Sequence, residues 1–364
     1  MSEIYGMNIK MAIYGESHGK SIGLVLDGLP PGLELDLDAI AAEMARRAPG
    51  QSSLTTARKE SDSVEIQSGF FEGRTTGTAL CAMIKNSDQH SRDYSILKDK
   101  MRPGHADYAG YVHYQGCNDY RGGGHFSGRL TAPLVFAGAI AKQALAAYGI
   151  VIGAHIRSVG GICDRPFNPM GEDDDLLRGL RKKSFCVLDD KAGEKMQQLI
   201  LEAKAGLNSV GGVVEVLAQH VPAGIGNPYF DSLESRLSHA LFSVPAVKAV
   251  EFGDGFAIAA MTGAEVNDQL HYNNGRVEAL TNHNGGVTGG ITNGMPVLFR
   301  AGIKPTPSIS REQRTVSLSS GEDTMLTIAG RHDPCIVQRA VPVIEAVTAW
   351  TIWDLLLEAK KWEK

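Results

Sequence analysis

The stretch TAPLVFAGAIAKQALAAYG at residues 131–149 decides the expected fold. From Thr131 to Tyr148 it is rich in alanine and apolar around nearly its whole circumference, and it ends at Gly149. A helix that is hydrophobic on all sides is buried on all sides. The stretch therefore predicts a core helix that other layers of structure must cover.

Short runs that are typical of strands lie C-terminal to this helix, at 213–217, 247–252, 256–261, 297–299, 315–318 and 325–328. Gly253-Asp254-Gly255 is expected to join the second and third runs as a hairpin. Because strands arrive in pairs rather than alternating with helices, antiparallel sheets in a layered α+β fold are expected. Further helices are expected at 37–48, 189–205, 231–242 and 342–361.

Composition excludes several classes of protein. The chain of 364 residues has 36 basic and 41 acidic side chains and a net charge of −5, which favours neither nucleic-acid binding nor a membrane surface. Apolar runs such as 130–141 are too short to span a bilayer, and the N-terminus lacks a signal-peptide core. A cytoplasmic protein is expected.

Two further absences narrow the chemistry. The five cysteines are odd in number and contain no C-x-x-C pair, which predicts reduced thiols and no metal site. No G-x-G-x-x-G pattern follows a strand and opens a helix, so a Rossmann dinucleotide domain is not expected.

Segments 102–107 (RPGHAD) and 119–129 (DYRGGGHFSGR) carry the densest set of functional groups. They bring two histidines, three arginines and a triple glycine to the start of the core helix. Backbone N–H groups at a helix N-terminus bind anions, and guanidinium groups bind phosphate and carboxylate with two hydrogen bonds. We expect a site for a phosphorylated anion here rather than a flexible loop with surface charges.

Shorter polar segments occur at 15–19 (GESHG), 304–308 (KPTPS), 330–335 (GRHDPC) and 282–290. GESHG alone is as typical of a solvated polar turn as of a site. Arg331 and Asp333 could bind a ligand or pair with each other, and the sequence leaves both open. Long polar loops at 86–124 and 271–294 are of the kind that often carry function. His155 and His239 have apolar neighbours and are expected to be packed.

In their order along the chain, GESHG, RPGHADYAG (102–110), DYRGGGHFSGRLTA (119–132), KPT (304–306) and GRHDPC resemble the chorismate synthase family over residues 10–345. RAVP at 339–342 adds to the match. The resemblance implies a single domain over 1–364, with a helical core between antiparallel sheets (a β-α-β sandwich), assembled as a homotetramer.

The resemblance also implies an activity: 1,4-anti elimination of phosphate from 5-enolpyruvylshikimate 3-phosphate to give chorismate, the last common step of aromatic amino acid biosynthesis. This lyase reaction needs reduced FMN but has no net redox change. No added reductase domain is visible, so an external flavin reductant is expected, with NADPH only as an indirect source.

The family's site residues map onto matching positions. His105 is expected to donate a proton to the leaving phosphate, His18 to govern flavin protonation, and Asp333 to take the proton of flavin N5, with Ser17 and Ser127 orienting them. The expected FMN contacts are His125, Phe126, Ser127, Ala246, Gly289, Lys304, Pro305, Thr306, Pro307, Ser308 and Arg331. The expected substrate contacts are Arg47, Arg58, Arg102, Arg129 and Arg331, with Arg339 and Arg46 as weaker candidates.

The chain departs from many relatives at His125-Phe126, at Ser53 and at Ala48, and the last two leave only Arg47 for a weak NADP site. An alternative is a flavin-dependent oxidoreductase acting on a phosphorylated carboxylate. A phosphate- or flavin-binding protein without catalysis is a second alternative, which would not need both His18 and His105.

Overall fold

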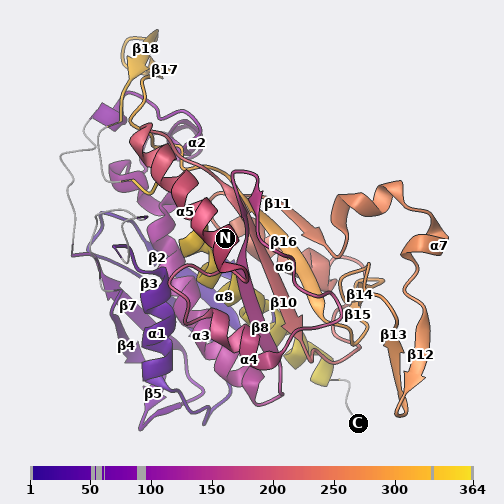
Figure 1. The fold of residues 1–364 in the computed structure, drawn as a ribbon. Helices are drawn as coiled ribbons and strands as arrows, with labels where there is room; N and C mark the ends of the chain where they lie inside the picture. Colours follow the sequence, from indigo (N-terminus) through magenta and orange to yellow (C-terminus); the bar gives the residue numbers. More distant parts are fainter. Residues whose placement is uncertain are drawn as a thin grey trace.

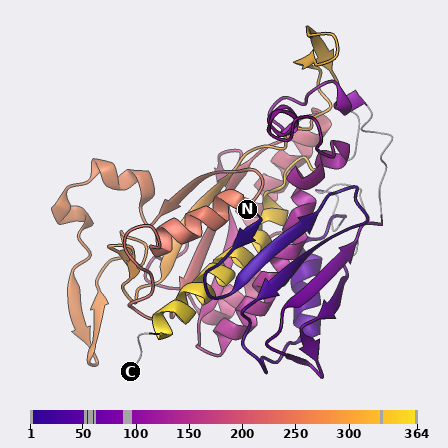
Figure 2. The same cartoon turned by 180° about the vertical axis from the view of Figure 1, so that it is seen from behind.

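The computed structural model describes residues 3–50, 54, 60, 62–87, 96–328 and 332–361. Two five-stranded antiparallel sheets enclose a layer of helices (Figures 1 and 2). This arrangement confirms the expected α+β sandwich with a helical core.

The first sheet comes from the N-terminal part of the chain. Its strands, in spatial order, are β1 (Ile4–Tyr5), β2 (Lys10–Gly15), β3 (Ser21–Asp27), β7 (Leu80–Lys85) and β4 (Val64–Ser68). Leu24 lies opposite Ile13 on one side and Ala82 on the other. Leu24 and Ala82 are almost fully buried, so one face of this sheet covers the helices.

The second sheet is built from β11 (Val247–Phe252), β16 (Val297–Ile303), β10 (Gly212–Gln219), β8 (Val151–Val159) and β9 (Ile162–Cys163), in that order. The central strand β10 has no exposed surface at Val214, Val216 or Leu217. A strand reads as a continuous apolar run when both of its faces are covered. Helices α4 (Asp174–Leu180) and α5 (Asp190–Ala205) cover the outer face of this sheet (Figure 1).

The helical layer consists of α1 (Leu37–Arg47), α3 (Thr131–Ala146), α6 (Leu233–Ser243) and α8 (Val337–Lys360). Fourteen of the sixteen residues of α3 are buried, which confirms the core helix. A Cβ on Gly138 would lie 2.3 Å from the Cα of Ala346, so glycine lets α3 and α8 pack closely. Helix α8 is long and apolar enough to cross a membrane, but 89% of its apolar window is buried, as in a core helix.

Smaller elements extend from this body. At one end lie α2 (Asp107–His113) and the hairpin of β17 (Gln313–Ser317) and β18 (Glu322–Leu326) (Figure 1). An arm on another side carries η4 (Gly255–Ala260), α7 (Gly263–Val266), β12 (Leu270–Asn273) and β13 (Arg276–Ala279). The remaining short elements are β5 (Phe70–Phe71), β6 (Arg74–Thr75), η2 (Arg121–Phe126), η3 (Gly128–Leu130), β14 (Val287–Thr288) and β15 (Ile291–Thr292).

Four sequence-based expectations are wrong in detail. Residues 256–260 lie in the 3₁₀ helix η4 instead of a strand, and Phe256 is 86% exposed. They do not pair with the edge strand β11, so the hairpin expected at Gly253-Asp254-Gly255 is wrong as well. Helix α8 begins at Val337 instead of at Pro342, which lies one turn inside it. The loops expected at 86–124 and 271–294 contain α2 and most of the β12–β13 hairpin.

Candidate active site

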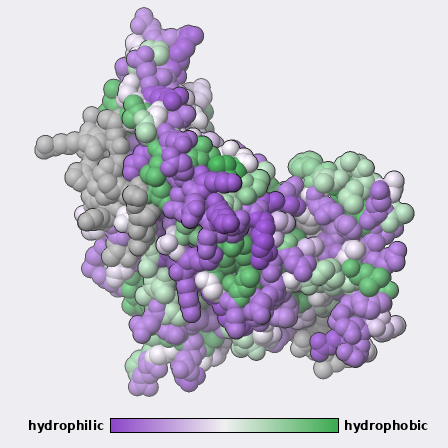
Figure 3. All heavy atoms as spheres, viewed as in Figure 1, coloured by the Kyte–Doolittle hydropathy of each residue, from purple (hydrophilic) through white to green (hydrophobic). Residues whose placement is uncertain are grey.

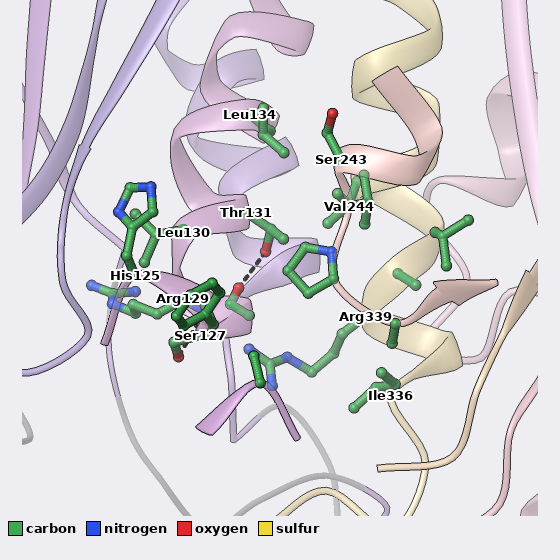
Figure 4. Close-up of a pocket in the computed structure, with 18 of the residues that line it drawn as sticks. His125, Ser127, Arg129, Leu130, Thr131, Leu134, Ser243, Val244, Ile336 and Arg339 are labelled. Atoms are coloured by element: carbon green, nitrogen blue, oxygen red, sulfur yellow. Dashed lines mark hydrogen bonds between the residues drawn. The ribbon is translucent and has the colours of Figure 1, made fainter. Parts of the chain in front are cut away.

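A cavity of about 930 Å³ opens where the start of α3, the end of α6 and the start of α8 meet. In Figure 4, Ser127 and Arg129 approach it from the segment before α3, Ser243 and Val244 from α6, and Arg339 and Ile336 from α8. The expected site residues that line it are Arg47, Arg102, His105, His125, Phe126, Ser127, Arg129, Ala246, Lys304, Thr306, Pro307, Ser308 and Asp333. Segments far apart in sequence thus form one concave surface.

The triple glycine lies between two of the expected histidines. Gly122, Gly123 and Gly124 all have positive φ, at 60°, 89° and 54°, which few other residues tolerate. A Cβ on Gly122 would lie 2.1 Å from the ring of His18, and one on Gly123 would lie 3.1 Å from that of His105. The glycines therefore let the backbone pass between both imidazole rings.

Ser17 and His18 lie behind this turn and are not among the residues lining the cavity. Ser17 is fully buried and His18 is 4% exposed. The backbone N–H of Ser17 donates to the carbonyl of Gly124 at 3.1 Å, which fixes the GESHG segment to the glycine turn. The Oγ of Ser17 has no hydrogen-bond partner among the described residues. Ser17 and His18 are thus buried beside the site, whereas Glu16 of the same segment is exposed.

His105 belongs to a triad with Asp107 and Arg102. Its Nδ1 lies 2.6 Å from the Asp107 carboxylate, which also accepts hydrogen bonds from Arg102 Nε and Nη2 at 2.7 Å. Burial alone would raise the pKa of Asp107, but the hydrogen bonds from Arg102 and His105 hold it well below its ordinary value. Because Asp107 occupies Nδ1, Nε2 is the ring nitrogen left to exchange a proton.

His332 has an opposite environment to that of His105. Burial, together with the positive charge of Arg102, lowers its pKa to about 4, so the ring is neutral near pH 7. Its Nε2 is buried and has no hydrogen-bond partner among the described residues. The cavity therefore contains one imidazole, that of His332, which burial keeps neutral near pH 7.

Asp333 pairs with Arg339, whose Nη1 lies 2.5 Å from Oδ2. Arg339 also donates from Nε to the carbonyl of Arg47 at 3.0 Å, which ties α8 to the end of α1. The suggested partner Arg331 lies outside the described residues, as do Arg58 and Ser53. Asp333 is only 9% exposed although it lines the cavity.

Local structure places Arg47 and Arg129 at the cavity. Helix α1 ends at Arg47 because Pro49 forces Ala48 into an extended conformation. Ser127 caps η3 by accepting a hydrogen bond from the N–H of Arg129 at 3.3 Å. Both arginines are almost fully buried, and both pair with Asp62. Arg46 points elsewhere, into a buried network with Glu43, Lys142 and Glu345.

Two lysines form a positive corner of the cavity. Lys304 donates from Nζ to the carbonyl of Gly104 and from its backbone N–H to that of Ala246. Burial and the neighbouring Lys248 lower the pKa of Lys304. No carboxylate pairs with either lysine among the described residues. The Oγ1 of Thr306 is buried nearby and is also without a partner in the described chain. This corner has the donors that a phosphate requires.

Some expected contacts lie elsewhere. Gly289 is in the β14–β15 turn, outside the cavity of this chain, and Pro305 does not line the cavity. The Asn282–Gly286 segment packs on Gly253 instead of facing the site. His155 is buried between Asp164 and Glu215, as expected for a packed histidine. No cluster of metal-ligating side chains occurs in the described part of the chain.

Sequence reasoning missed Glu60, Asp62 and Lys248 and gave no role to Asp107. Asp107 was within the RPGHAD segment, two residues after the histidine that it holds. For the buried arginines, the need for carboxylate partners was a usable signal, since buried charges are paired.

Comparisons with known proteins agree with this geometry. A family model described as chorismate synthase matches residues 9–357. The chain is 45% identical over 353 residues to a chorismate synthase of Methanocella arvoryzae, covering 97% of this chain and 94% of that one. It is 46% identical over 359 residues to one of Thermococcus gammatolerans, covering 98% of each. A crystal structure titled chorismate synthase superposes with a TM-score of 0.73 at 28% identity, over 97% and 93% of the two chains. The chain belongs to the chorismate synthase family.

Proposed function

We propose that this chain releases phosphate from 5-enolpyruvylshikimate 3-phosphate by 1,4-anti elimination and so forms chorismate, with reduced FMN bound and no net redox change. The observation that carries the proposal is the glycine turn between His18 and His105, beside a cavity lined with arginine and lysine. Family membership supplies the reaction class, and the site has groups suited to its charges.

The substrate has a phosphate and two carboxylates. Arg47, Arg102, Arg129 and Arg339 line the cavity and are largely shielded from water. Hydrogen bonds from charged donors are stronger in such water-poor surroundings. These guanidinium groups would bind and orient the substrate. Arg58 and Arg331 stay candidates for the same role.

His105 would donate the proton to the departing phosphate. Asp107 orients the ring and directs Nε2 away from itself, since it holds Nδ1 at 2.6 Å. Arg102 fixes Asp107 in turn, through two side-chain hydrogen bonds. His105, Asp107 and Arg102 then act as one unit that presents a proton at a defined place.

The residues fit an FMN molecule. Lys248 and Lys304, which pair with no carboxylate among the described residues, and the Thr306 hydroxyl would suit its phosphate. His125, Phe126, Ser127, Ala246, Pro307 and Ser308 would line the rest of its site. When bound, reduced FMN supplies electron density to the allylic system. Asp333 would accept a proton at its carboxylate. His18 and Ser17, which lie behind the glycine turn, would set the protonation of the flavin edge next to them. Gly289 and Pro305 stay proposals, reached only if another chain or a movement completes the site.

The assembly and setting are also proposals: one functional unit over 1–364, a cytoplasmic homotetramer, and an external flavin reductant with NADPH as an indirect source. Exposed apolar side chains on the arm support self-association, among them Phe256, Leu270, Tyr272 and Val277. Figure 3 shows apolar patches on this arm beside an otherwise mainly hydrophilic face.

An anaerobic assay with photoreduced FMN tests the proposal. Many turnovers for each reduced flavin are expected. They are measured as released phosphate and as the absorbance of chorismate. Product formed in proportion to reductant consumed would instead indicate a flavin oxidoreductase, and FMN binding without turnover would indicate a binding protein.

A further inference from the structure

We propose that Asp62 is a positioning residue that holds the guanidinium groups of Arg47 and Arg129 from behind, so that both stay charged and fixed at the wall of the anion cavity. The inference rests on the proposed function of the cavity as an anion site. It concerns a residue that does not line the cavity itself.

The contacts are specific for both arginines. Asp62 Oδ2 lies 2.8 Å from Arg47 Nη2, and its Oδ1 pairs with Arg129 Nη1. The three side chains are 0%, 1% and 3% exposed, respectively. Glu60 adds a second carboxylate, 2.8 Å from Arg129 Nε. One carboxylate therefore sets the distance between two guanidinium groups from different elements, the end of α1 and η3.

Asp62 lies on the far side of these arginines. Arg47, Arg129 and Glu60 line the cavity, whereas Asp62 has no exposed side-chain surface and does not line it. A carboxylate that competed with the substrate would have to face the cavity. Asp62 instead acts as a support, as residues behind a binding group commonly do.

Arg47 keeps one donor for a ligand. Its Nη1 donates to the carbonyls of Gly128 and Arg129 and to Thr131 Oγ1 at 3.3 Å, while its Nε is buried and has no hydrogen-bond partner among the described residues. A buried donor without a partner costs free energy unless a ligand satisfies it. An anionic group in the cavity would supply the acceptor.

Electrostatics explains why a carboxylate is needed there. Burial lowers the pKa of Arg47, Asp62 raises it, and the nearby Arg339 and Arg129 lower it further. Three guanidinium groups close together repel one another, and the repulsion grows as water is excluded. With Asp62 among them, they can stay charged and close before the substrate arrives.

The backbone gives independent support. Asp62 has φ of 50°, in the left-handed region that non-glycine residues seldom adopt. Strained conformations of this kind persist where the surrounding structure requires them, frequently at binding sites. The conformation here places a carboxylate between two buried arginines just before β4.

The test is Asp62→Asn, which keeps shape and removes charge, with Glu65→Gln as the matched control. Glu65 is a carboxylate of the next strand that pairs with exposed Lys85. Two readouts are used: the Kd of inorganic phosphate by calorimetry on the FMN-loaded protein, and KM and kcat for the substrate. Asp62→Asn should weaken phosphate binding and raise KM by about tenfold, a typical effect of losing a hydrogen bond to a charged group. FMN affinity should stay within about twofold of the wild type.

Asp62→Glu is the second variant, and it also serves if the asparagine variant does not fold. It keeps the charge but moves the carboxylate oxygens by the length of one methylene group. If Asp62 positions Arg47 and Arg129, this variant should bind phosphate more weakly too. Wild-type phosphate affinity in Asp62→Glu, or unchanged or tighter binding in Asp62→Asn, would overturn the inference. The calorimetric result stands even if the wild type shows no chorismate synthesis, which would refute only the proposed function.

Discussion

Gly122→Ala should reduce turnover by about a hundredfold. The added Cβ would lie 2.1 Å from the His18 ring, whereas carbon atoms in contact are about 3.5 Å apart. The ring, which is buried, would have to move by about 1.4 Å. A misplacement of about 1 Å of a group at a reacting centre can cost about a hundredfold in rate.

Two other glycines make the prediction specific, because alanine at positive φ also strains the backbone. Gly149 has φ of 73° and open space around its Cβ position, so Gly149→Ala has the strain without a clash. Gly123→Ala meets the His105 ring at 3.1 Å and requires a shift of only about 0.4 Å. Backbone strain alone should cost each of the three variants about 1 kcal/mol of stability, and the clash should add to this loss in Gly122→Ala.

The assay measures kcat under anaerobic conditions with photoreduced FMN, and thermal melting for each variant. The expected order of loss in kcat is Gly122→Ala, then Gly123→Ala, with Gly149→Ala near the wild type. Equal kcat in Gly122→Ala and Gly149→Ala would refute the reasoning, because it would mean that the position of His18 has no bearing on turnover.

Further predictions concern single charges. His105→Ala should lower kcat by at least about a hundredfold and leave the FMN Kd nearly unchanged, as measured by flavin fluorescence; loss of FMN affinity would reassign the residue. Asp333→Asn should slow turnover without a large fall in melting temperature, whereas a large fall would mean that its pair with Arg339 is chiefly structural. Glu345→Gln should lower the free energy of unfolding by about 3 kcal/mol, measured in urea, because Arg46 and Lys142 would lose a buried partner. His332 has a folded pKa of about 4, below the ordinary 6.5, so the unfolded chain binds more protons between these values. The contribution of the neutral His332 ring to folding stability is complete above about pH 6.5 and is lost as the pH falls toward 4. The melting temperature of His332→Asn should therefore vary less with pH over this range than that of the wild type.

The core of the fold was predictable because burial leaves a mark on sequence. Helix α3 is apolar all round, and a layer between two sheets is one arrangement that hides every face of such a helix. The strand predicted at 256–261 fails for the same reason in reverse. An apolar run does not reveal whether it is covered, and Phe256 and its neighbours belong to an exposed arm.

Some residues that line the cavity were predictable from residue type alone, as for Gly122 and His105. The supporting residues of the site were not predictable in this way. Asp62 and Glu60 are acidic, and a search for an anion site looks for cations. What marks them is their contact with buried arginines, which depends on how β4, α1 and η3 come together.

The carboxylates also explain how a buried cluster of arginines can exist before substrate binds. Each guanidinium group at the cavity has an internal partner, in the pairs Arg102–Asp107, Arg129–Glu60, Arg47–Asp62 and Arg339–Asp333. An uncompensated buried charge is strongly destabilising, so arginines without these partners would turn outward or disturb the fold. Paired arginines are held in fixed directions, and binding then loses less side-chain entropy. Attraction for the anion comes from donors left unsatisfied, such as Arg47 Nε, and from Lys248 and Lys304, which pair with no carboxylate in the described chain. Under the proposed function, selectivity for a polyanion would come from the placement of donors more than from the amount of positive charge.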